Sequence, residues 1–200
     1  MTAADRVANL LGALALAVTD RTSAAIAAAA GQSVSAAAAL SAMHHFLDRP
    51  TLDQLRRVLG LTHSGAVRLV DRLVDAGLVT RGPGPDGRSR SITLTSAGRE
   101  AAERVSAARA AVLGDALDDL TPDERDALHA LMGRLMASIV RAKDGGAWIC
   151  RLCDLVACGR ADGECPTANA AAAKYGPAAR AGVTAADTGG DASTSVGEPS

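Results

Sequence analysis

The alternation of hydrophobic and polar positions between residues 51 and 77 predicts two short helices joined by a tight turn. Leucine and valine recur at helical spacing over residues 52–59, and Gly60 interrupts the pattern. Thr51 and Gln54 have the spacing of a capping box, and Thr62 is a favourable N-cap for the second helix. The second helix has one apolar face, and its opposite face carries Ser64, Arg68, Asp71, Arg72 and Asp75. This pattern is typical of a helix-turn-helix unit.

Residues 78–95 predict a β-hairpin directly after this unit. Gly77 is placed to end the second helix, where glycine is favoured. Residues 78–81 and 91–95 have the pattern of strands, and the second alternates polar and apolar side chains, as a half-buried strand does. Between them, residues 82–87 contain two Pro, three Gly and one Asp, a composition typical of a loop. The chain is therefore expected to be mainly α-helical with one small antiparallel sheet.

Longer helices are predicted before this region. Residues 4–19 are apolar on nearly all sides, which is typical of a helix buried between subunits, and residues 23–30 predict further helix. The apolar run of residues 7–18 is shorter than the ~20 residues that span a bilayer. Acidic residues flank it on both sides, so we expect neither a signal peptide nor a membrane segment. Ser33 can cap a helix that extends to about residue 47, where the approach of Pro50 ends it.

Two further helices are predicted after the hairpin. Thr95 can cap a helix over residues 96–120, and Thr121 followed by Pro122 and Glu124 has the sequence of a second helix start. We expect this last helix to extend to about residue 142. The expected units are N-terminal helices at 1–48, the helix-turn-helix and hairpin at 49–99, C-terminal helices at 100–146, a cysteine-rich segment at 147–167 and a disordered Ala/Gly-rich tail at 168–200.

Positive charge is concentrated in the central region. From Arg49 to Arg99 there are nine Arg and four Asp, a local charge of +5, whereas the whole chain of 200 residues has a net charge of −1. A phosphate backbone would be attracted to such a region.

The central region resembles the winged helix-turn-helix of MarR-family transcriptional regulators. The resemblance is specific, because order and spacing agree over about fifty residues. The matching positions are residues 52–61, 70–73, 75–79, Arg81, the Asp86-Gly87-Arg88 wing tip and residues 94–98. The resemblance implies a mainly α fold, with an α+β winged helix flanked by helices of a dimerisation region. It also implies a cytoplasmic homodimer that binds a pseudo-palindromic operator in double-stranded DNA, usually as a repressor.

The resemblance also suggests which side chains contact DNA. Two recognition helices would enter successive major grooves, and the wings would reach the flanking minor grooves. On the helix, Ser64, Arg68 and Arg72 are candidates for base-edge or phosphate contacts. Thr62 and His63 lie at its N-terminus, where backbone N–H groups favour phosphate.

In the hairpin, the candidates are Arg81, Arg88 and Arg90. Asp86 is positioned to orient Arg88, and both residues match the wing motif of the family. Arg90 is expected to contact the DNA backbone.

Two adjacent histidines precede the helix-turn-helix. His44 and His45 point about 100° apart on a helix, so at most one of them faces the core. In the family, this region borders a cleft for small phenolic or lipophilic ligands, so either histidine is a candidate for binding a small-molecule effector.

All four cysteines lie within residues 150–165, which we call the four-cysteine loop. Cys150, Cys153, Cys158 and Cys165 have the spacing C-x2-C-x4-C-x6-C, and Pro166 follows. In a cytosolic protein, such clusters more often bind metal or do redox chemistry than form structural disulfides. Four thiolates suit zinc or an iron–sulfur cluster, and the spacing leaves both open. The loop loosely resembles the cluster loop of SoxR-type redox regulators, although the second gap is much shorter in those proteins.

Two alternatives to a DNA-binding regulator remain from the sequence. One is a thiol oxidoreductase that uses these cysteines, although a thioredoxin-like Cys150–Cys153 dithiol would need a βαβ unit that the pattern does not show. The other is an interaction module that retains the winged helix without binding DNA. We expect a regulator rather than an enzyme.

Overall fold

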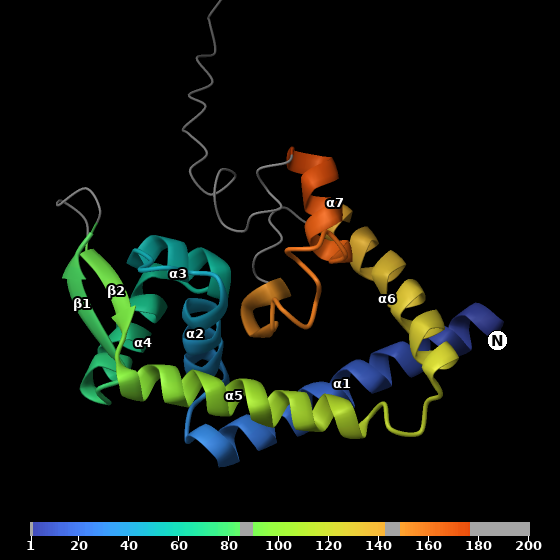
Figure 1. Ribbon diagram of the computed structural model, residues 1–200, viewed down its shortest axis with the longest axis horizontal. Coiled ribbons are helices and arrows are strands. Elements are labelled where there is room, and N and C mark those ends of the chain that lie inside the picture. The colour runs from blue at the N-terminus through green and yellow to red at the C-terminus, as the bar shows by residue number, and fades with distance from the viewer. Residues whose placement is uncertain (1, 85–89, 143–148, 177–200) are drawn as a thin grey trace, which may run out of the picture.

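The computed structural model of the chain describes residues 2–84, 90–142 and 149–176, and in these residues the protein is mostly helical with one small sheet (Figure 1). The elements are α1 (Ala3–Ala30), α2 (Val34–His45), α3 (Leu52–Leu59), α4 (His63–Asp75), β1 (Val79–Pro83), β2 (Arg90–Leu94), α5 (Ser96–Asp115), α6 (Pro122–Ala142), the 3₁₀ helix η1 (Ile149–Leu152) and α7 (Pro166–Tyr175).

The helix-turn-helix comprises α3 and α4, and its boundaries follow the predicted caps. Thr51 and Gln54 form the capping box, in which Thr51 N–H donates to Gln54 Oε1 at 2.8 Å. Gly60 ends α3 with a φ of 67°, in the left-handed region that glycine adopts most easily. Thr62 Oγ1 accepts a hydrogen bond from Gly65 N–H at 3.2 Å and so begins α4. These interactions span three residues, which explains why the sequence pattern predicts them.

The hairpin forms an antiparallel two-stranded sheet. Its register pairs Val79 with Leu94 at one end and Pro83 with Arg90 at the other. The inner end is fixed to α5, because Thr95 Oγ1 accepts from Gly98 N–H and donates to Gly77 O at 2.7 Å. The hairpin therefore projects from the helices as a wing (Figure 1).

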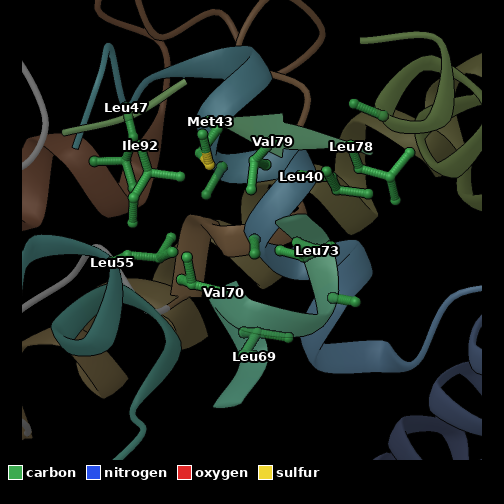
Figure 2. Close-up of a cluster of buried hydrophobic side chains, with 14 of the residues drawn as sticks. Leu40, Met43, Leu47, Leu55, Leu69, Val70, Leu73, Leu78, Val79 and Ile92 are labelled. Atoms are coloured by element: carbon green, nitrogen blue, oxygen red, sulfur yellow. The ribbon is translucent and has the colours of Figure 1, made fainter. Parts of the chain in front are cut away.

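The main hydrophobic core lies between α2, the helix-turn-helix and the wing (Figure 2). α2 is central to it, and most of its buried residues are alanine, whose small side chain lets other helices approach closely. Larger side chains from α2 and from the surrounding elements fill the remaining space, among them Leu40, Met43, Leu55, Leu69, Val70, Leu73, Val79 and Ile92. Burial of these side chains fixes the orientation of α4 relative to the wing.

Two helix boundaries differ from the prediction. α1 is one continuous helix, because residues 20–22 contain no helix-breaking residue. α5 ends at Asp115 instead of about residue 120. Asp118 and Asp119 lie just beyond this end, where negative charge opposes the helix dipole.

The tail predicted to be disordered from residue 168 begins instead with a helix. α7 continues to Tyr175 and packs along α6. Pro166 suits the first position of this helix, Ala168 and Ala171 are buried, and the small Gly133 of α6 lies against Pro166. The alanine tract therefore gains buried contact that its composition alone does not reveal. Residues 177–200 of the expected tail lie outside the described residues.

α1 packs along α5, although much of its surface is exposed (Figure 1). Its C-terminal part contributes Ile26 to a second buried cluster with Ala37 and Val105. By length and composition alone, residues 4–30 would suffice to cross a membrane, because they contain an 18-residue window with a mean hydropathy of 1.3, whereas the sequence pattern indicated a shorter apolar run.

Candidate nucleic-acid interface

α4 has the two-sided character that a recognition helix requires. Its inner face is buried against the core through Ala66, Leu69, Val70 and Leu73. Its outer face and N-terminus are exposed and carry the five predicted contact residues, namely Thr62, His63, Ser64, Arg68 and Arg72. The structure therefore brings all the predicted residues of this helix to one accessible surface.

At the N-terminus of α4, some hydrogen-bonding groups already have partners within the chain. The Thr62 hydroxyl accepts from Gly65 N–H and lies 3.4 Å from Ser64 Oγ. The initial N–H groups of a helix have no partners within it, and the helix dipole gives them partial positive charge. An anion approaching His63 would therefore meet hydrogen-bond donors in an exposed position.

The wing supplies arginines beside α4. Arg81 on β1 forms an ion pair with Asp71 of α4, and Arg90 on β2 is exposed. Together with Leu52 and Ile92 they line an open hollow of about 460 Å³. The predicted wing-tip residues Asp86 and Arg88 lie outside the described residues.

Two features of this surface were not predicted. The Asp71 carboxylate engages Arg81, so this arginine is positioned by the recognition helix itself. Arg49 Nη2 donates to Pro83 O at 3.2 Å, which ties the residues before α3 to the outer end of β1. The sequence pattern could not predict either contact, because the two partners are 10 residues apart in the first contact and 34 residues apart in the second.

The two histidines have different surroundings. His44 is exposed and lines a pocket of about 140 Å³, together with Met43, Leu47, Asp48, Arg49, Ile92, Thr93, Leu94 and Arg99. This volume is below the ~300–1,000 Å³ of ordinary ligand sites. His45 is half-buried, and its Nε2 lies 3.1 Å from Ser106 Oγ on α5. Burial, followed by the neighbouring His44, lowers the pKa of His45, while Asp154 opposes the shift. An effector role for either histidine stays a prediction.

The four-cysteine loop lies between the DNA-binding module and α6–α7 (Figure 1). Its first part, η1, packs against α2, and Leu152 joins the cluster formed by Ile26, Ala37 and Val105. Its end, Cys165, is the residue before α7 and is buried together with Cys150. All four cysteines are free thiols.

The thiols contact each other in two pairs. Cys150 and Cys153 form a side-chain hydrogen bond, which lowers the pKa of Cys153 to about 6 and raises that of Cys150. Burial, followed by the charge of nearby Cys165 and a hydrogen bond with it, raises the pKa of Cys158 to about 11. Within the described residues, no three His, Cys, Asp or Glu side chains already have the arrangement of a metal site.

Comparison with known proteins agrees with this geometry. A family model for the MarR family matches residues 31–89, which contain the helix-turn-helix and strand β1 of the wing. A MarR-family protein from Bacillus stearothermophilus has a similar structure, with a TM-score of 0.61 and 21% identity over 68% of this chain and 94% of its own. A probable transcriptional regulator from Pseudomonas aeruginosa is 28% identical, with a TM-score of 0.50 over 62% and 96%.

CouR from Rhodococcus jostii, bound to p-coumaroyl-CoA, is also similar, with a TM-score of 0.52 and 21% identity over 68% of this chain and 94% of its own. The fold therefore places this chain in the class of winged helix-turn-helix proteins. Residues 31–89 match the MarR family, and the chain has the fold of a MarR-family transcriptional regulator. The resemblance predicted from the sequence is thereby confirmed.

Proposed function

We propose that this protein is a sequence-specific DNA-binding regulator that acts as a homodimer on a pseudo-palindromic operator, with repression as the expected outcome. The observation that carries the proposal is the exposed face of α4, which presents Ser64, Arg68 and Arg72 next to the arginines of the wing. The opposite face of α4 is buried, so the helix is held rigidly with its polar side outward. Such a helix can enter a major groove while the wing contacts the backbone beside it.

The exposed apolar side chains of α1 and α6 support a homodimer. Leu10 and Leu16 of α1 are each 68% exposed, and Leu131 of α6 is 56% exposed. Large contiguous apolar surface is costly in water and commonly marks an interface. A second copy covering these helices would bury this surface and bring two α4 helices to two half-sites of one operator.

A small-molecule signal and a cytoplasmic location complete the proposal. The similarity to CouR, which binds p-coumaroyl-CoA, supports a ligand-responsive regulator. Because the pocket beside His44 is small in a single chain, we expect a larger effector to bind where the second copy completes the site. The apolar residues of α1 would then face a partner helix, without any association with a membrane.

Fluorescence anisotropy with labelled genomic fragments tests DNA binding. We expect one or a few fragments to bind at nanomolar protein, with an affinity that falls steeply between 50 and 200 mM salt. Uniformly weak binding to all fragments, or none, would favour the interaction module or the thiol oxidoreductase.

Sedimentation of charge-introducing variants tests the dimer. We expect Leu10→Glu and Leu14→Glu to release monomers and to abolish operator binding together. The matched control is Val156→Glu, which places the same charge on a side chain that is 89% exposed outside α1 and α6. A wild-type protein that sediments only as monomer at micromolar concentration would contradict the proposed assembly.

A further inference from the structure

We propose that the four-cysteine loop binds one thiolate-ligated metal centre, either a zinc ion or an iron–sulfur cluster. The proposal goes beyond DNA binding, because neither the winged helix nor the proposed dimer requires these residues. It rests on where the fold places the four thiols, on the positive charge around them and on how the loop is anchored at both ends.

The first observation is that the four thiols of this short loop interact in two pairs. Cys150 hydrogen-bonds with Cys153, and Cys158 with Cys165. The two pairs also interact electrostatically, since Cys165 acts on Cys150 and Cys153 acts on Cys158. Metal binding requires these two pairs to close around one centre, with each thiol releasing its proton.

The second observation is that two of the cysteines are buried although they form no disulfide bond. Cys150 and Cys165 are only 4% and 5% exposed, yet no disulfide joins any of the four cysteines. Two of the thiols are buried and the other two are partly buried. Four thiolates are the ligand set of structural zinc and of iron–sulfur clusters.

The third observation is the positive charge that surrounds the thiols. Arg160 Nη1 donates to Cys150 Sγ at 3.8 Å. Arg109 of α5 and Arg151 of η1 both act electrostatically on Cys153. Four thiolates around a doubly charged centre leave a net charge of about −2, and arginines stabilise such a charge in a partly buried position.

The loop is anchored to two different parts of the molecule. At its start, Leu152 packs with Ile26 and Val105, which fixes η1 to α1, α2 and α5. At its end, α7 packs along α6, and Lys174 Nζ donates to Arg141 O at 3.0 Å. A bound metal would therefore tie α6 to the DNA-binding module, and its loss would loosen that connection.

Metal analysis of the full-length protein purified without oxygen tests the proposal. We expect about one zinc per chain in colourless protein, or iron with inorganic sulfide and brown absorbance. The same content should return after the stripped protein is treated with zinc alone, or with iron and sulfide under reducing conditions. The two results distinguish zinc from a cluster, and either one supports a thiolate centre.

Matched variants show whether the thiols hold the metal. Cys153→Ser and Cys158→Ser alter partly buried thiols and should reduce metal from about one centre per chain to nearly none. Asp162→Asn changes an exposed side chain of the same loop and should retain it. Circular dichroism should be the same for all three proteins, which excludes unfolding as the cause.

Three results would overturn the proposal. They are an absence of metal both before and after reconstitution with four freely titrating thiols, two stable disulfides in the anaerobic protein, or full metal content in both serine variants. DNA binding measured on the same samples is a separate readout, so a failure of the metal site leaves the proposed regulator function untouched.

Discussion

Asp71 of the recognition helix α4 and Arg81 of the wing strand β1 form an ion pair with a separation of 2.5 Å. The pair joins the two elements that are proposed to contact DNA, and it places Arg81 against α4. Arg81 is therefore both a proposed DNA contact and a link between the wing and the helix.

A double-mutant cycle measures this link. For Asp71→Asn, Arg81→Gln and the double variant, we expect a coupling free energy of unfolding of about 0.2–1 kcal/mol, because both side chains are partly exposed. The coupling should decrease as salt is added. A coupling of zero at low salt would mean that the pair does not hold the wing.

Substitutions on α4 should change discrimination between DNA sequences. Arg68→Ala or Ser64→Ala should lower the preference for operator over unrelated DNA by about 1–3 kcal/mol for each direct base contact. Arg104→Ala removes an exposed arginine of α5 and serves as the control. Competition binding with operator and random duplex separates the two effects, and equal losses on both duplexes would assign these residues to the phosphate backbone.

The wing-tip prediction concerns Arg88, which lies outside the described residues. Arg88→Ala should weaken binding to all sequences and reduce the slope of log affinity against log salt by about 1. The slope is obtained from binding at several salt concentrations. If both affinity and slope stayed unchanged, the assignment of Arg88 to a DNA contact would be wrong.

Gly98 is required by a close approach of the wing to α5. A Cβ atom at this position would lie 1.9 Å from Leu78 O, a backbone atom that cannot move without displacing β1. Gly98→Ala should therefore lower the free energy of unfolding by at least about 1–3 kcal/mol.

Gly114 in the same helix is the matched control. A Cβ atom there meets nothing within 4 Å, so Gly114→Ala should stabilise by about 0.5–1 kcal/mol. Urea unfolding of both variants gives the comparison, and equal stabilities would contradict the close approach at Gly98.

His45 should make stability depend on pH. Because burial lowers its pKa in the folded protein, the unfolded chain binds the proton more tightly. Neutral His45 contributes fully to the free energy of unfolding above its unfolded pKa of about 6.5. This contribution is lost as the pH falls through the lower pKa of His45 in the folded protein. His45→Gln should reduce the loss of stability between pH 7.5 and 5.5, as measured by urea unfolding. An unchanged pH profile would assign the dependence to other groups.

The sequence by itself determined the helix-turn-helix and the wing. Thr51, Gly60, Thr62 and Thr95 act within a few residues of themselves, through hydrogen bonds and backbone conformations that depend on local chemistry. The apolar face of α4 follows from its periodicity, and the opposite face is exposed for the same reason. The likeness to MarR regulators could be stated from the sequence because it rests on these local features in a fixed order.

Only the tertiary structure decided which distant residues meet. Three such features depend on how helices and strands pack. They are the ion pair of Asp71 with Arg81, the side-chain contact of His45 with Ser106 and the lack of space for a side chain at Gly98. The same holds for α7, whose alanine tract resembles a disordered tail until contact with α6 buries Ala168 and Ala171. Composition gives the intrinsic tendency of a segment, whereas the free energy that orders it comes from surface buried against residues far away in the chain.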